Sequence, residues 1–253
     1  MNNILKLAAP PNLSSAAAEL AAKYKKANPS ASALVLGPTG EVGREVLRYL
    51  LASNAYSKVV VLTRREIEYD GPNKEAFEQI TIDYDKLNEF QHVFERNHQC
   101  CFCCLGTTRG KNGKDFFYKV DHDYVIASAQ LAKKANIPRF SVCSASNARS
   151  DSWFFYSKVK GQVEDELTDM KFNKLSIFKP AFLECDREES RLGERIASVI
   201  IKPFKFIMPT ILAVPTTTVG KAMVYDSLLP LSEETPHVST FTNPMILTEG
   251  GKM

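Results

Sequence analysis

The chain has 253 residues, of which 44% are hydrophobic, and a formal net charge of +3. This length and composition allow a substantial buried core and favour one α/β domain. The near-balanced charge, without a long basic run that carries interleaved aromatic residues, argues against nucleic-acid binding as the main activity. The longest apolar stretch, Ile196 to Ile211, is interrupted by lysines and prolines, so the sequence predicts no membrane span.

Residues 1–31 differ in composition from the rest and are expected to form an N-terminal extension to a single domain over 32–253. Ala16–Lys26 is an alanine-rich stretch behind Ser14 and Ser15, which are candidate N-caps, and it predicts a short helix. The helix either docks on the domain or belongs to a frayed tail. A mitochondrial presequence is the third alternative, but this segment contains no arginine.

Short apolar runs alternate with longer helical patterns from Ala33 onward. The runs are continuously hydrophobic, which is typical of parallel strands buried on both faces and joined by right-handed crossovers. The predicted fold class is therefore α/β, a Rossmann-type doubly wound parallel sheet with helices on both faces and, from about residue 180, a small C-terminal substrate-loop region. The expected strands are Ala33–Leu36, Lys58–Thr63, Gln79–Asp83, Cys100–Leu105, Arg139–Ser144 and Lys174–Phe178. The expected helices are Val42–Ala52, Lys86–Arg96, Asp115–Ala135, Trp153–Met170 and Thr217–Leu229.

A glycine-rich loop directly follows the first predicted strand and opens a helix. Its spacing is G-x-x-G-x-x-G, and no lysine with a following Ser or Thr closes it as in a P-loop. Glycine permits a tight turn, a close approach of the backbone to pyrophosphate and close helix–strand packing, and the helix N-terminus offers free N–H groups. An ordinary strand-to-helix turn is the alternative. We expect a dinucleotide to contact Gly37, Thr39, Gly40, Glu41, Val42 and Gly43.

The end of the second predicted strand indicates which dinucleotide binds. An NAD-preferring protein usually has an acidic residue there for the ribose 2′-hydroxyl, whereas this chain has Arg64 and Arg65 after Thr63. A guanidinium suits a 2′-phosphate through charge and paired hydrogen bonds. The sequence therefore predicts NADP(H), although two arginines at a loop can also be solvated charges. Asp83, at the end of the third predicted strand, is a candidate acceptor for the adenine amino group or a helix cap.

Four of the cysteines fall in one apolar run, Cys100, Cys101, Cys103 and Cys104. In a strand, alternate residues point to opposite faces, so these four thiolates cannot converge on one ion. We expect reduced cysteines that pack as small hydrophobic residues, and no metal site.

Tyr156 and Lys160 are four residues apart, a spacing that places both on one face of a helix. A phenol that transfers a proton near neutral pH needs a nearby cation to lower its pKa from about 10, and Lys160 is a candidate for that cation. Ser144 ends an apolar run, where its hydroxyl could meet a substrate carbonyl. Ligands in such sheets bind beyond the carboxyl ends of the strands. The glycine loop, Gly106, Ser144 and Lys179-Pro180 all follow predicted strand ends and are therefore expected to share one crevice.

Five separate motifs together resemble one family, the Tat-interacting-protein type of atypical short-chain dehydrogenase/reductase. The similarity covers roughly residues 32–230. The motifs are the glycine loop 37–43, Cys101 to Lys111, Val120 to Val125, Tyr156 to Gly161, and Phe178 to Pro180 with Cys185 to Arg191.

The resemblance implies a Rossmann fold, bound NADPH and a Ser-Tyr-Lys active site. Ser144 would orient the substrate carbonyl, Tyr156 would exchange its proton, and Lys160 would also bond the nicotinamide ribose. The cofactor would further contact Leu105, Gly106, Thr107 and Thr108, and the backbone from Pro180 to Leu183. The resemblance also implies regulatory roles through protein partners.

Asp121 stands where many short-chain enzymes carry an asparagine that holds a water of a proton relay. It borders the buried stripe of its predicted helix, where a carboxylate would attract the Lys160 ammonium directly or through water. That attraction would offset part of the effect of Lys160 on the Tyr156 pKa. A solvated helix charge is the alternative for Asp121.

Two functions follow from these patterns. The first is an NADPH-dependent oxidoreductase that acts on a small carbonyl or alcohol, with the charged loop from Ala181 to Arg191 beside its substrate pocket. The second is an NADPH-binding regulatory protein with little or no turnover. A kinase and a serine hydrolase are excluded because their signature motifs are missing. The cytoplasm is the expected location, the nucleus a second one, and the mitochondrion is less favoured.

Overall fold

The computed structural model of the protein describes residues 4–8, 10, 12–107, 113–184 and 213–253. Thr108, the charged residues of the loop that ends at Arg191 and the apolar stretch 196–211 lie outside these ranges, so the roles predicted for them stay predictions.

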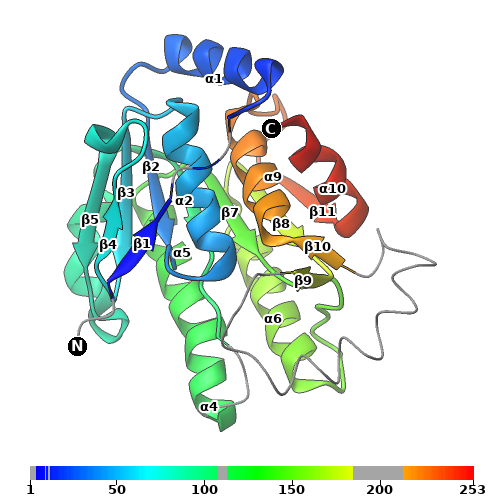
Figure 1. The fold of residues 1–253 in the computed structure, drawn as a ribbon. Helices are drawn as coiled ribbons and strands as arrows, with labels where there is room; N and C mark the ends of the chain where they lie inside the picture. The colour runs from blue at the N-terminus through cyan, green and yellow to red at the C-terminus, as the bar shows by residue number, and fades with distance from the viewer. Residues whose placement is uncertain (1–3, 9, 11, 108–112, 185–212) are drawn as a thin grey trace.

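A seven-stranded parallel sheet forms the middle layer of the molecule (Figure 1), with the strand order β11-β8-β7-β6-β2-β3-β5. The strands are β2 Ser32–Leu36, β3 Lys58–Thr63, β5 Phe77–Thr81, β6 His98–Cys103, β7 Arg139–Cys143, β8 Lys174–Lys179 and β11 His237–Thr242. All but the last overlap a predicted strand. β11 was not predicted because it is an edge strand, in which half-buried residues alternate with exposed ones.

Helices cover both faces of the sheet, which confirms the predicted doubly wound fold. Successive residues of a strand point to opposite faces, so Val35 joins one core cluster and Leu34 the other. The first cluster is completed by α1 Ser15–Ala27, α2 Glu41–Ser53, α9 Thr216–Leu228 and α10 Asn243–Lys252. The second is completed by α3 Gln91–Phe94, α5 Tyr124–Lys134 and α6 Phe155–Asp169.

Two predicted helices differ from the observed ones. In place of a helix over Lys86–Arg96, a 3-10 helix, η2 Tyr84–Phe90, precedes the short α3. Its buried residues Tyr84 and Leu87 are three apart, the spacing that a 3-10 helix places on one side. The helix predicted over Asp115–Ala135 is α4 Gly113–Tyr118 and α5, joined by a π-helical segment, η3 Lys119–Asp123. Such segments are frequent at functional sites.

The N-terminal residues pack on the domain, and the predicted helix is present as α1. Ser14 is its N-cap, because the Ser14 hydroxyl accepts a hydrogen bond from the Ala17 N–H at 3.1 Å. Ala17 and Tyr24 are buried in the first core cluster. The Ser14 hydroxyl also donates to the carbonyl of Lys252 in α10 at 2.6 Å, so α1 is tied to the C-terminal helix. Upstream, β1 Leu5–Leu7 pairs in parallel with β4 Ile67–Tyr69.

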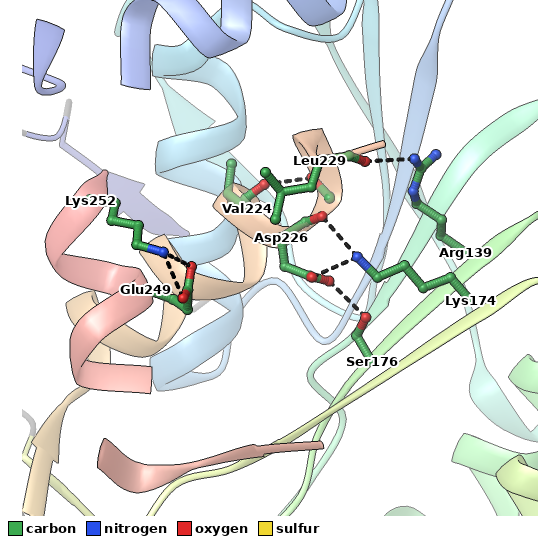
Figure 2. A network of polar contacts seen from close by, with 9 residues as sticks. Arg139, Lys174, Ser176, Val224, Asp226, Leu229, Glu249 and Lys252 are labelled. Carbon is green, nitrogen blue, oxygen red and sulfur yellow. Dashed lines mark hydrogen bonds and ion pairs between the residues drawn. The ribbon is translucent and has the colours of Figure 1, made fainter. Parts of the chain in front are cut away.

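A buried polar network fixes α9 against the amino ends of β7 and β8 (Figure 2). The Lys174 ammonium lies 2.6 Å from the Asp226 carboxylate, which also accepts the Ser176 hydroxyl at 2.7 Å. Beside them, the Arg139 guanidinium donates to the Leu229 carbonyl at 2.9 Å, just beyond the end of α9. Because both Lys174 and Asp226 are buried, pairing offsets the cost of removing their charges from water.

The remaining elements are small. They are the 3-10 helix η1 Lys74–Ala76 and the parallel pair β9 Phe182–Glu184 and β10 Ala213–Pro215, which follows β8. Over the ranges that the structure describes, every helix is too short or too polar to cross a bilayer.

Candidate active site

The glycine loop is shaped by close backbone contacts at its two ends. Gly37 has a φ of +72°, in the left-handed region that favours glycine. A Cβ on Gly37 would lie 2.6 Å from the Cys104 carbonyl oxygen, and a Cβ on Gly43 would lie 2.0 Å from the Gly37 carbonyl oxygen. The loop therefore packs directly on the end of β6 and on the first turn of α2. The intervening Gly40 has more room, since its nearest contact would be 3.4 Å away.

A cleft opens beside this loop at the carboxyl ends of β2, β3 and β6. The space in and in front of it that no protein atom fills, open solvent included, is about 760 Å³. Arg64 and Arg65 also line it, so both arginines border the same space as the glycine loop. The cleft residues are Gly37, Pro38, Thr39, Gly40, Leu62, Thr63, Arg64, Arg65, Tyr84, Cys104, Leu105, Gly106, Val120 and Tyr124.

Seven of the residues proposed for the cofactor meet in this cleft, namely Gly37, Thr39, Gly40, Arg64, Arg65, Leu105 and Gly106. The others that the structure describes lie outside its lining: Glu41, Val42, Gly43, Asp83, Thr107, Tyr156, Lys160, Pro180 and Leu183. Asp83 instead caps η2, where its carboxylate accepts the Asp85 N–H at 3.0 Å. Of the two roles considered for Asp83, the structure shows the helix cap.

Two tyrosines line the cleft that sequence reasoning did not single out. Tyr84 and Tyr124 are stacked, with ring centroids 5.4 Å apart. The Tyr84 hydroxyl donates to the Leu62 carbonyl at 3.0 Å and accepts the Gly37 N–H at 3.4 Å, so it joins the ends of β2 and β3. Tyr84 directly follows Asp83 at the end of the third predicted strand, and this position could have identified it as a residue of the cleft.

Lys160 and Asp121 form a direct ion pair next to Gly106, which lines the cleft. The Lys160 Nζ lies 2.8 Å from one Asp121 oxygen, and both side chains are less than a tenth exposed. The other Asp121 oxygen accepts the Thr107 N–H at 2.7 Å. Asp121 thus joins the loop after β6 to α6, and the solvated-charge alternative does not apply. Burial alone would lower the Lys160 pKa, but Asp121 and Tyr156 raise it above its ordinary value.

The expected fall in the Tyr156 pKa does not occur in this structure. Burial of the phenol raises the Tyr156 pKa above its ordinary value, and this effect outweighs the lowering by Lys160. Cys143 and Asp121 raise it further. The prediction was wrong in its net direction because it counted the nearby charges and not the loss of solvent around the ring.

The Ser144 hydroxyl is hydrogen-bonded to a residue that the sequence analysis did not propose. It donates to one oxygen of Glu164, which lies on α6 one turn beyond Lys160. The other Glu164 oxygen lies 2.6 Å from the Nζ of Lys179, at the end of β8. The carboxyl ends of β7 and β8 and one face of α6 thus meet in one partly buried polar cluster.

The cysteines of β6 alternate between the two faces of the sheet, as expected. Cys100 packs in the first core cluster and Cys101 and Cys103 in the second. Burial raises the pKa of Cys100 to about 12 and that of Cys143, on β7, to about 11. No cluster of three His, Cys, Asp or Glu side chains that could hold a metal ion occurs within the described ranges.

The sequence was compared with protein families and with known proteins. A family model described as NAD(P)H-binding matches residues 37–190. The rat protein HTATIP2 is 39% identical over 199 residues, which are 79% of this chain and 82% of the rat protein. The Saccharomyces cerevisiae protein named "Protein FMP52, mitochondrial" is 33% identical over 160 residues, or 62% of this chain and 68% of the yeast protein.

Solved structures share the fold at low sequence identity. The Bordetella bronchiseptica enzyme WbmH, in complex with NAD+, superposes with a TM-score of 0.62 at 13% identity, covering 84% of this chain and 75% of WbmH. A short chain dehydrogenase family protein from Francisella tularensis gives a TM-score of 0.59 at 10% identity, covering 85% of this chain and 98% of that protein.

Proposed function

Since the chain belongs to the NAD(P)H-binding family and is a homologue of rat HTATIP2, we propose that it is an NADPH-dependent short-chain oxidoreductase acting on a small carbonyl or alcohol. One observation carries this proposal. Gly106 lines the cleft, and a Cβ on Gly106 would lie 3.2 Å from the Asp121 carboxylate and 3.8 Å from the Lys160 ammonium. The cleft that suits a dinucleotide therefore reaches the ion pair beside Tyr156.

The residues of the cleft fit the parts of NADP(H). The glycine loop and the start of α2 would hold the pyrophosphate through backbone N–H groups. Arg64 and Arg65, which line the cleft, suit the 2′-phosphate. Lys160, which lies outside the cleft lining next to Gly106, would bond the nicotinamide ribose. When bound, the nicotinamide supplies or accepts a hydride at the substrate carbon.

Tyr156 then gives a proton to the substrate oxygen in reduction and takes it back in oxidation. Lys160 keeps a positive charge near the phenol, and its raised pKa keeps that charge at physiological pH. Asp121 holds Lys160 in place and at the same time opposes its effect on the Tyr156 proton.

Replacing both arginines tests the selection of NADP(H). Arg64→Ala/Arg65→Ala is expected to weaken NADPH binding by about 100-fold, because two charge-assisted contacts to a phosphate are each worth roughly 1.5 kcal/mol. NADH binding should change by less than about threefold, since NADH carries no 2′-phosphate. Titration of protein fluorescence with both nucleotides measures this. An equal loss for NADH and NADPH would contradict the assignment.

Asp121→Asn is expected to change the pH dependence of the reaction. Reduction needs the protonated phenol, so its rate falls as the pH rises through the Tyr156 pKa. Asp121 raises that pKa, so its neutral replacement should lower the Tyr156 pKa and move the alkaline limit of carbonyl reduction to lower pH. The profile of kcat/KM against pH measures the shift. Identical profiles for wild type and variant would show that Asp121 does not act on the proton transfer.

Tyr156→Phe separates the oxidoreductase from a regulatory protein that only binds NADPH. The raised Tyr156 pKa favours the regulator as a second candidate, because such a phenol is a weak acid. For an oxidoreductase, NADPH consumption across a panel of small aldehydes and ketones should fall about 1,000-fold or more in the variant, within the range for a lost general acid. NADPH binding should be retained. Stoichiometric binding without turnover that depends on Tyr156 would instead support the regulator.

The location of the protein is part of the same proposal. We propose a cytoplasmic location on the sequence alone, but the yeast relatives named mitochondrial favour the mitochondrion as the alternative. Fractionation of cells that express the full chain with a C-terminal tag distinguishes the two.

A further inference from the structure

Arg64 and Arg65, the two arginines of the cleft, lie on the short turn 64–66 between β3 and β4, the arginine turn. Both residues are exposed, and neither guanidinium forms an ion pair with a carboxylate of the described residues, so both are available to an anion. Binding a phosphate with exposed arginines carries the cost of ordering them. That cost is smaller when the backbone that carries the arginines is already fixed.

Thr63, the last residue of β3, fixes the backbone of this turn through its side chain. The Thr63 hydroxyl donates to the Arg65 carbonyl at 2.7 Å and accepts the Arg65 N–H at 3.2 Å, so it binds both backbone polar groups of one residue. Thr63 is itself held in the sheet, because it is 1% exposed and its carbonyl accepts the Ile82 N–H at 2.9 Å. Arg65 is therefore tied to a rigid strand end.

Gln79 on β5 fixes the residue that directly follows the arginine turn. Its side-chain oxygen accepts the Ile67 N–H at 2.9 Å, and its amide nitrogen donates to the Ile67 carbonyl at 3.1 Å. The Gln79 amide thus pairs with Ile67, the first residue of β4, as the backbone of a neighbouring strand would. Two side chains therefore hold the arginine turn, one at each end.

We infer that Thr63 and Gln79 are positioning residues for NADP(H) selection, because they fix the backbone of the arginine turn before a nucleotide binds. This inference rests on the proposed function and deepens it by naming residues that act through the arginines. The only proton of the Thr63 hydroxyl goes to the Arg65 carbonyl, so Thr63 does not donate it to the phosphate. NADH has no 2′-phosphate, so its binding does not depend on how the turn is held.

Thr63→Val tests the first position, because it removes the hydroxyl and keeps the branched shape of the side chain. The dissociation constant of NADPH is expected to rise about tenfold, the cost of ordering roughly one residue of backbone on binding, and that of NADH to change less than about twofold. Adenosine 2′,5′-bisphosphate and 5′-AMP should show the same contrast without the nicotinamide. Thr63→Ser keeps the hydroxyl and should keep the wild-type constants. Equal losses with and without the 2′-phosphate, or no loss, would overturn the inference.

Gln79→Met tests the second position with a side chain of similar length that makes neither contact to Ile67. Binding of NADPH and of adenosine 2′,5′-bisphosphate should weaken about threefold or more, and binding of NADH and 5′-AMP should not change. Wild-type constants for all four nucleotides would overturn the role of Gln79.

The arginines supply the background that separates positioning from packing. Adding Thr63→Val to Arg64→Ala/Arg65→Ala should change the affinity for neither nucleotide, because the effect of Thr63 passes through the arginines. A further loss in that background would overturn the inference. Thr248→Val is the matched control, since it removes a hydroxyl contact to the Pro244 carbonyl in α10, and it should leave NADPH selection unchanged.

The backbone order parameter of the Arg65 amide, measured by nuclear magnetic resonance without nucleotide, reports on the turn directly. It is expected near the roughly 0.85 of rigid backbone in the wild type and below about 0.6 in Thr63→Val. An unchanged order parameter would overturn the inference. If Arg64→Ala/Arg65→Ala weakens NADPH and NADH equally, the proposed selection of NADP(H) itself fails. A selective loss in that variant without one in Thr63→Val overturns the positioning role alone.

Discussion

Gly43→Ala is expected to lower the affinity for NADPH by roughly 100-fold and to destabilise the protein without nucleotide by about 1–3 kcal/mol. The added methyl group would lie 2.0 Å from the Gly37 carbonyl oxygen, a distance that the backbone must relieve. The same oxygen accepts the Gly40 N–H at 3.1 Å, so moving it disturbs the whole loop. Nucleotide titration and thermal unfolding of the nucleotide-free protein measure the two effects.

Gly40→Ala is the matched control in the same loop. Its methyl group would meet the protein at 3.4 Å, an ordinary contact, and Gly40 has a negative φ that alanine adopts. The midpoint temperature of thermal unfolding without nucleotide should therefore be unchanged. The affinity for NADPH can still fall, because the added methyl group would meet the pyrophosphate. Equal thermal destabilisation by the two variants would contradict the packing argument for Gly43.

The parts of the site that the sequence predicted are those fixed by local pattern. The glycine loop follows a strand and opens a helix, and both features are visible within a few residues. Arg64 and Arg65 follow the neighbouring strand, so the rule that ligands bind at the carboxyl ends of strands brings them to the same cleft. The pair of Asp121 and Lys160 was predicted because helix periodicity places Asp121 next to a buried stripe.

The rest depends on burial and on contacts between distant elements. The Tyr156 pKa is set first by loss of solvent around the phenol, which residue spacing does not reveal. The partnership of Ser144 with Glu164 joins residues 20 positions apart on different elements. The sequence did contain one indication that Glu164 belongs to the site. Glu164 is four residues beyond Lys160 and so lies on the same helix face. Lys179 was expected in the same crevice as Ser144 because both follow strand ends.

Asp121→Leu is expected to destabilise the protein by about 3–5 kcal/mol, the cost of leaving one member of a buried ion pair without its partner. The variant removes the acceptor of the Lys160 ammonium and that of the Thr107 N–H. The double variant Asp121→Leu/Lys160→Met should recover most of the loss, because it removes both charges together. Urea unfolding at pH 7 measures each variant. A double variant as unstable as the single one would show that the Thr107 contact, and not the charge pair, carries the stability.

The pH dependence of Asp121→Leu distinguishes a lost charge pair from poor packing. In the wild type, Asp121 raises the Lys160 pKa above that of an unfolded lysine, about 10.4. The ion pair therefore contributes fully to the free energy of unfolding below about pH 10.4, and this contribution is lost only as the pH rises through the higher folded pKa. In the variant, Asp121 no longer raises the Lys160 pKa, and Tyr156 does not raise it at pH 7 to 9 because its phenol stays neutral below its raised pKa. Burial should then lower the Lys160 pKa below that of the unfolded chain. The folded variant can then release the Lys160 proton as the pH rises, and a neutral amine costs less to bury. The difference in unfolding free energy between the two proteins should therefore narrow from pH 7 to pH 9, whereas a packing defect would keep it constant.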